Sequence, residues 1–274
     1  MPPPCNANNR YVTQSDLYRE FDAATSIIVP SGMLAALSRS MASGSDIAIQ
    51  TTATGLQEMP HPAEGVLART RIVSETVEDL RVGKAVWLSG PTGIGKTTIA
   101  ALTATAIPKS WSLQRCIGIT GEPLEQELRR MVGVVGSTPE IEGLLLDALD
   151  ADVDLTEFGA FAALKSTLER LNLPLLVTSY RSPPQGIVLD NIISRPVPYL
   201  TEEEVSKLIM LHNGDPSRWS FFIQMAGGSG YPALSALLCR SLSKRGWPDS
   251  EMKRWMSDSF QSQDIMVTRE GVRR

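Results

Sequence analysis

An eight-residue run rich in glycine has the residue types and spacing best suited to hold phosphate groups. It fits the pattern G-x-x-x-x-G-K-[ST] at every fixed position, with an apolar run before it and an alanine-rich one after it. Glycines let backbone N–H groups point at phosphate oxygens, and the N-terminus of a following helix adds a positive dipole. In this pattern the lysine reaches the β- and γ-phosphates, and the threonine hydroxyl completes a Mg²⁺ shell. The predicted nucleotide contacts are Gly90, Pro91, Thr92, Gly93, Ile94, Gly95, Lys96, Thr97 and Thr98. The simplest role of Thr98 is to start the helix.

The run GLLLDALD at 143–150 offers the carboxylate that a Mg²⁺-nucleotide requires. Asp147 follows three leucines, so it is expected at the end of a buried strand and is the predicted metal ligand together with Thr97. In rapidly hydrolysing relatives the next residue is acidic and acts as general base, but here it is Ala148. Either Asp150 takes that role or hydrolysis is slow. Both aspartates have the alternative role of capping the next helix.

A further apolar run, LLVTSYR, ends in polar residues that are expected at the carboxyl edge of a central strand. Ligands of open parallel sheets bind at that edge. Arg181 is therefore the predicted reader of the γ-phosphate, since a guanidinium there distinguishes a triphosphate from a diphosphate. The alternative is a surface arginine on an exit loop.

Apolar runs without alternation, separated by helical patterns, predict an α/β protein with a parallel sheet covered by helices on both faces. After residue 200 the strand patterns stop and capped helices follow. The expected strands are 85–90, 114–120, 143–150 and 173–180, and the expected helices are 74–81, 96–107, 122–132, 155–171, 200–213, 215–228, 231–246 and 249–260.

This rhythm divides the chain into three parts. Residues 1–60 form an N-terminal helical and extended segment with a linker near 55–65, residues 61–198 the α/β core with the phosphate loop, and residues 199–274 a helical lid. The first part is expected to contain short helices within 15–42 and a strand within 45–52.

Composition narrows the function classes. A net charge of −4 argues against a uniformly basic nucleic-acid surface, although a local basic patch is compatible with it. Three separated cysteines and two histidines suggest neither a disulfide framework nor a zinc site. The sequence contains no secretory signal and no apolar run of membrane-spanning length, so a cytoplasmic location without a membrane partner is expected.

Taken in order, these motifs resemble the STAND class of signal-transducing P-loop NTPases, which includes NACHT and NB-ARC domains and is allied to the AAA+ fold. The acidic strand matches D-G-h-D-E at its two aspartates, with alanine at its glycine and glutamate positions. The strand-four T-S-R is matched with one tyrosine inserted. The matching residues are Gly95, Lys96, Thr97, Asp147, Asp150, Thr178, Ser179, Arg181, Gly230, Tyr231 and Pro232. The family also has an h-h-G-R element that lies near the nucleotide base. Residues 66–69 match it loosely, with alanine in place of glycine and Arg69 as the arginine.

The resemblance implies that Pro232 packs near the base and that Arg69 lies close to it. It also implies an ADP-bound resting state, lid opening and self-association driven by ATP, slow hydrolysis, and an effector or sensor partner of unknown identity. Since STAND proteins join an effector, a switch and a sensor, the chain is expected to be a fragment of a longer protein or a minimal switch. Neither Arg69 nor Pro232 distinguishes adenine from guanine.

Two other functions stay open. One is an AAA+-like ATPase that remodels or loads a protein or nucleic acid, with Arg181 or Arg195 acting across a subunit interface. The other is a small-molecule kinase, for which the sequence offers no acceptor pocket.

Overall fold

The computed structural model describes residues 56–59, 62, 65–149, 159–183, 191–250 and 252–253. By its contacts the chain divides into two units, Ala48–Trp247 on one side and Met1–Ile47 with Pro248–Arg274 on the other. The architecture below is that of the first unit. The helices expected within 15–42, the strand within 45–52 and Asp150 lie outside the described residues, as does most of the helix expected at 249–260.

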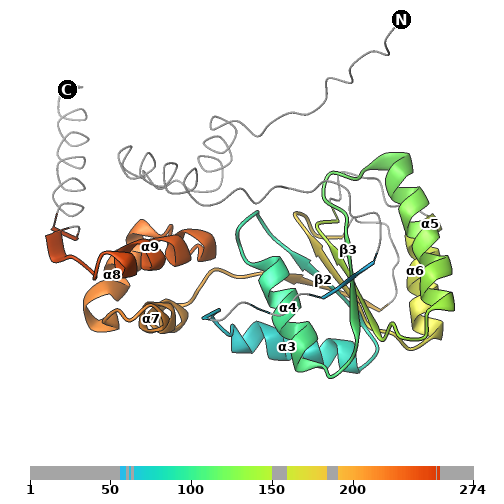
Figure 1. Ribbon diagram of the computed structural model, residues 1–274, viewed down its shortest axis with the longest axis horizontal. Coiled ribbons are helices and arrows are strands. Elements are labelled where there is room, and N and C mark those ends of the chain that lie inside the picture. Colours follow the sequence, from blue (N-terminus) through green and yellow to red (C-terminus); the bar gives the residue numbers. More distant parts are fainter. Residues whose placement is uncertain are drawn as a thin grey trace, which may run out of the picture. The chain divides into compact units, whose positions relative to one another are not determined.

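A six-stranded, mostly parallel sheet forms the centre of this unit (Figure 1). Its spatial order is β1-β3-β4-β5-β2-β6, and only the short edge strand β1 runs antiparallel to its neighbour. All residues of β2 and β5 are buried, which agrees with the apolar runs of the sequence. The strands are β1 (Gln57–Glu58), β2 (Ala85–Ser89), β3 (Trp111–Arg115), β4 (Gly143–Asp147), β5 (Leu175–Ser179) and β6 (Ile192–Pro196).

Helices cover both faces of the sheet, so the α/β fold class predicted from the sequence is confirmed. Figure 1 shows α3 and α4 on one side and α5 and α6 on the other. Side chains alternate between the two faces along each strand. Trp87 therefore packs towards α6, where its ring meets Phe161 edge-to-face, whereas Asp147 faces the opposite way. These helices are α3 (Thr70–Arg81), α4 (Lys96–Ala106), α5 (Gly121–Ser137) and α6 (Gly159–Arg170).

Three further helices, α7 (Glu202–Leu211), α8 (Pro216–Ala226) and α9 (Pro232–Lys244), follow the last strand. The predicted capping box of α7 is confirmed, because the Thr201 hydroxyl accepts from the Glu204 N–H and the Glu204 carboxylate accepts from the Thr201 N–H. Prolines begin α8 and α9, where a missing N–H costs nothing. Trp219 centres their packing against Phe222 and Trp247.

Besides the short edge strand β1, which falls within the linker expected near 55–65, two strands differ from the sequence-based expectations. The strand expected at 114–120 is instead β3, Trp111–Arg115, because Trp111 and Leu113 supply its buried apolar side chains. The residues after it form a turn in which the Ile119 N–H donates to the Cys116 carbonyl and Ile117 is exposed. The second is β6, which the sequence analysis missed since its half-exposed residues and final proline lack an apolar run.

The helix expected at 74–81 is also longer than predicted and begins at Thr70. Its first residues follow Arg69, whose backbone adopts the left-handed conformation with φ 45°.

Candidate nucleotide site

The glycine-rich run forms a loop between the end of β2 and the start of α4. The Gly90 N–H donates to the Ser179 carbonyl at 3.3 Å, which fastens the loop to the end of β5. Gly93 and Gly95 have φ of 87° and 96°, a conformation that glycine adopts without strain. Ile94 is fully buried and anchors the centre of the loop in the core. The loop is therefore held from both sides, and its last glycine is the N-cap of α4.

Lys96, the first residue of α4, folds its side chain back over this loop. Its ammonium donates to the Gly90 carbonyl at 2.6 Å and to the Pro91 carbonyl at 3.1 Å. A bound phosphate offers the same ammonium a charged acceptor, and hydrogen bonds to charged acceptors are the stronger ones. The lysine is thus placed to exchange two carbonyl contacts for phosphate oxygens.

Asp147 joins two threonines that lie far from it in the sequence. One of its carboxylate oxygens accepts from the Thr97 hydroxyl at 2.8 Å and from the Thr178 hydroxyl at 2.7 Å. The Thr178 oxygen also accepts from the Ala148 N–H at 2.8 Å. A hydroxyl and a carboxylate are oxygen donors of the kind that Mg²⁺ prefers. Among the described residues no cluster of three His, Cys, Asp or Glu side chains could hold a metal, so the Mg²⁺ prediction rests on Thr97 and Asp147.

The position after Asp147 carries no acid and has an unusual backbone. Ala148 has φ 55°, in the left-handed region that glycine favours. The Leu149 N–H donates to the Thr178 carbonyl at 2.8 Å, and Leu149 is fully buried. The bonds from the Ala148 N–H to the Thr178 hydroxyl and from the Leu149 N–H to the Thr178 carbonyl hold the segment after β4 in this conformation.

Neither Arg181, the predicted reader of the γ-phosphate, nor Arg195, considered as an arginine that acts across a subunit interface, lines the cavity described below. Arg181 is exposed, and its neighbour Tyr180 lines that cavity instead. Because Tyr180 follows Thr178 by two positions, the alternation of side chains along a strand explains why these two share a side. Arg195 pairs with Glu75 at 2.8 Å and with Asp79. The γ-phosphate role of Arg181 stays a prediction.

A cavity of about 900 Å³ lies over the phosphate loop. Its walls come from the sheet and α4 on one side and from α7 and α9 on the other, and its volume lies within the usual range for ligand pockets. The predicted residues that line it are Arg69, Thr92, Gly93, Ile94, Gly95, Lys96, Thr97, Thr98, Asp147 and Pro232, together with Thr178. The predicted contacts Gly90 and Pro91 do not line it.

Two of the lining residues that the sequence analysis missed carry or can carry a positive charge. Arg240 on α9 and His212 at the end of α7 both border the cavity. Burial, and then the positive charge of Arg240, lower the pKa of His212. The available signal was that Arg240 follows Pro232 by eight residues on one helix, about two turns further along.

The N-terminus of α9 touches the phosphate loop directly. The Tyr231 hydroxyl donates to the Thr92 carbonyl, and the Ala233 N–H donates to the Gly93 carbonyl at 3.1 Å. A Cβ at Gly93 would lie 3.0 Å from the Ala233 methyl and 3.1 Å from the Tyr231 hydroxyl. The glycine is therefore required by packing as well as by φ, and the loop cannot move without disturbing α9.

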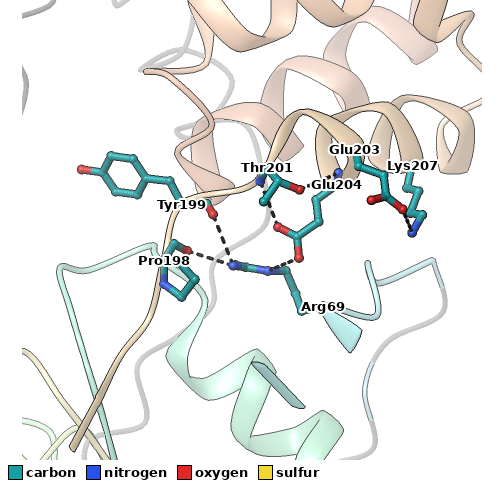
Figure 2. Close-up of polar contacts among 7 residues, drawn as sticks. All are labelled: Arg69, Pro198, Tyr199, Thr201, Glu203, Glu204 and Lys207. Atoms are coloured by element: carbon teal, nitrogen blue, oxygen red, sulfur yellow. Dashed lines mark hydrogen bonds and ion pairs between the residues drawn. The ribbon is translucent and has the colours of Figure 1, made fainter. Parts of the chain in front are cut away.

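Arg69 makes a second connection between the sheet and the helical segment (Figure 2). Its guanidinium donates to the Glu204 carboxylate at 3.0 Å and to the Pro198 carbonyl at 2.9 Å, with a longer contact of 3.5 Å to the Tyr199 carbonyl. Glu204 is the same residue that caps α7. Arg69 thus fastens the start of α3 to the start of α7. It also lines the cavity, and its contact with the nucleotide stays a prediction.

The mostly parallel sheet and the glycine-rich loop between β2 and α4 define the class, an α/β P-loop fold. No family model matches the sequence, and no curated protein matches it. Among solved structures the chain is similar to C. elegans PCH-2 at 13% identity with a TM-score of 0.38, over 57% of this chain and 51% of that one. This chain thus spans about half the length of PCH-2. None of the described helices has both the length and the apolar character needed to cross a membrane.

Proposed function

We propose that this protein is an ATP-binding switch NTPase of the STAND type, in which the nucleotide reports a state rather than driving rapid turnover. The observation that carries the proposal is the direct contact between the helical segment and the phosphate loop, through Tyr231 and Ala233. A protein that only hydrolyses ATP needs the loop. A switch also needs a second element that responds to what the loop holds.

In this proposal the phosphate loop holds ATP or ADP, Lys96 neutralises the β- and γ-phosphates, and Thr97 with Asp147 holds Mg²⁺. When bound, the metal neutralises phosphate charge. Thr178 orients the carboxylate of Asp147 through its hydroxyl. Pro232, which lines the cavity, packs near the base.

Slow hydrolysis is proposed because Ala148 cannot act as a general base. Hydrogen bonds to Thr178 fix the backbone of Ala148 and Leu149, but neither residue has a carboxylate that could activate a water molecule. Asp150 stays the proposed base for whatever turnover occurs.

The ADP form is proposed as the resting state, with Tyr231 seated on the Thr92 carbonyl. A γ-phosphate adds negative charge to the cavity, which Arg240 and, by the earlier prediction, Arg181 read. Differential contact with that phosphate shifts the lid and exposes a surface for self-association and for an effector or sensor partner. The proposed domains are the N-terminal segment 1–60, the α/β core 61–198 and the helical lid 199–274.

The test is nucleotide content, turnover and mass in solution of the purified chain, with Lys96→Ala beside it and Lys207→Ala as the matched control. Lys207 pairs with Glu203 on the surface of α7, outside the cavity. The proposal expects bound ADP, turnover well below about 1 s⁻¹, and assembly only with a non-hydrolysable ATP analogue. Brisk turnover that is lost in Lys96→Ala, without assembly, contradicts it.

An AAA+-like remodelling ATPase is the second candidate, favoured by the position of Arg240. An arginine on a helical lid that borders the phosphate cavity can stabilise the charge of the transition state. Strong stimulation of ATP hydrolysis by a polypeptide or a nucleic acid distinguishes this candidate from the switch.

A further inference from the structure

A second cavity, of about 370 Å³, lies at the opposite end of the sheet. It is bordered by Ala85 and Leu175, the first residues of β2 and β5, whereas the nucleotide cavity is bordered by residues at the far ends of the strands. A five-residue strand is about 13 Å long. The two cavities share no lining residue, so a ligand here would not touch the phosphate loop.

Four cationic side chains and one carboxylate line this cavity. Arg81 comes from the last turn of α3, Lys84 from the turn before β2, Lys109 from the loop before β3, and Lys165 from α6. The carboxylate is Glu169, one turn after Lys165. In a chain whose net charge is −4, four elements thus bring positive charge to one place.

Within the part of the chain that the structure describes, ion pairing accounts for one of these four positive charges. Lys165 is 7% exposed and its ammonium lies 2.6 Å from the Glu169 carboxylate. Among the described residues, Arg81, Lys84 and Lys109 form no ion pair. Elsewhere on the surface some cations do meet a glutamate one turn away, as in the pairs Arg129–Glu125 and Lys207–Glu203. Like charges that gather without a counter-charge repel one another, and an anion removes that cost.

The types of side chain that line the cavity indicate which kind of anion it would bind. Lysine ammonium groups are compact point charges that suit phosphate oxygens. Glu169, Asn172 and Asn191 add acceptor oxygens, which suit ligand hydroxyls. The volume is near the lower end of ligand pockets and well below that of the nucleotide cavity. The chemistry is that of a small phosphorylated molecule with several hydroxyl groups.

We propose that the cavity between the end of α3, the loop before β3 and α6 binds a sugar phosphate. The phosphate lies among Arg81, Lys84 and Lys109, and the hydroxyl groups face Glu169 and the two asparagines. This site is independent of nucleotide binding and does not rest on the switch function.

The experiment titrates the full chain with ribose 5-phosphate by calorimetry, with inorganic phosphate and ribose as separate probes. Binding is expected in the wild type and in Lys96→Ala, because the phosphate loop is not part of this cavity. The double variant Lys84→Ala/Lys109→Ala is expected to weaken binding about tenfold or more. The matched double variant Lys207→Ala/Lys244→Ala removes the same charge outside both cavities and is expected to change the affinity less than about twofold.

Four results overturn the proposal. They are the absence of binding up to about 10 mM ribose 5-phosphate, equal weakening in both double variants, loss of binding in Lys96→Ala, and equal affinity for inorganic phosphate. The thermal unfolding midpoint of each variant is measured first, so that loss of folding is not read as loss of binding. ADP affinity, measured on the same samples, tests the switch separately.

Discussion

The Arg69–Glu204 pair offers the sharpest test of how the sheet and the helical segment are joined (Figure 2). Its side chains are 6% and 18% exposed, so the charges interact with little screening by water. Glu204→Gln removes the negative charge but keeps an oxygen for the Thr201 N–H, because glutamine also serves at this position of a capping box. The substitution therefore isolates the ion pair from the cap.

The expected loss in the free energy of unfolding depends on which hydrogen bonds Arg69 retains after the substitution. Loss of one partner of a buried ion pair costs about 3–5 kcal/mol when the other charge is left alone. Here the guanidinium retains the Pro198 carbonyl at 2.9 Å, and Glu204 is partly exposed, so we expect about 2 kcal/mol for Glu204→Gln. Glu204→Ala also loses the cap and is expected to cost about 1 kcal/mol more. For a unit of this size, 2 kcal/mol corresponds to a fall of about 4–8 °C in the unfolding midpoint.

The assay is urea unfolding of the full chain, with Glu203→Gln as the control. Glu203 is the adjacent residue of the same helix turn and pairs with the exposed Lys207. The change in the free energy of unfolding for Glu203→Gln is therefore expected to lie within the error of the measurement. Equal stability of Glu204→Gln and Glu203→Gln would refute the reasoning. Equal losses for Glu204→Gln and Glu204→Ala would refute the separation of ion pair and cap.

Three further outcomes are expected. Gly93→Ala lowers ADP affinity about tenfold or more in equilibrium binding, because its Cβ would crowd the Ala233 methyl at 3.0 Å and φ is 87°; unchanged affinity would show that α9 leaves the loop easily. Asp147→Asn removes the charged acceptor of two threonine hydroxyls and is expected to abolish the Mg²⁺ dependence of ATP binding in titrations with and without EDTA; a retained dependence would place the metal elsewhere. Burial and Arg240 lower the pKa of His212 below 6.5 in the folded state, so the unfolded state binds more protons and stability is lost as pH falls below that value. His212→Gln, unfolded in urea at about pH 7.5 and about pH 5.5, should lose part of that dependence, and an unchanged dependence would mean that other groups cause it.

Local features of this protein were readable from the sequence because each depends on neighbouring residues. The glycines that need positive φ, the lysine and threonine that open α4 and the capping box of α7 all act within a few positions. The apolar runs predicted the α/β class and most of the strands, since buried parallel strands need unbroken apolar residues. β6 was missed because an edge strand has no such requirement.

Only the tertiary structure decided which distant residues meet. Strand order brings Asp147 to Thr97, 50 residues away, and to Thr178, 31 residues away. The return of the chain after β6 brings the Tyr231 hydroxyl to the Thr92 carbonyl, 139 residues away, and pairs Arg69, which lines the nucleotide cavity, with Glu204. Side-chain periodicity records which face of an element is buried, but it does not record which other element covers that face. The loop that can hold a nucleotide can thus be predicted from the sequence. The contacts that connect the loop to distant residues depend on the packing of the whole unit.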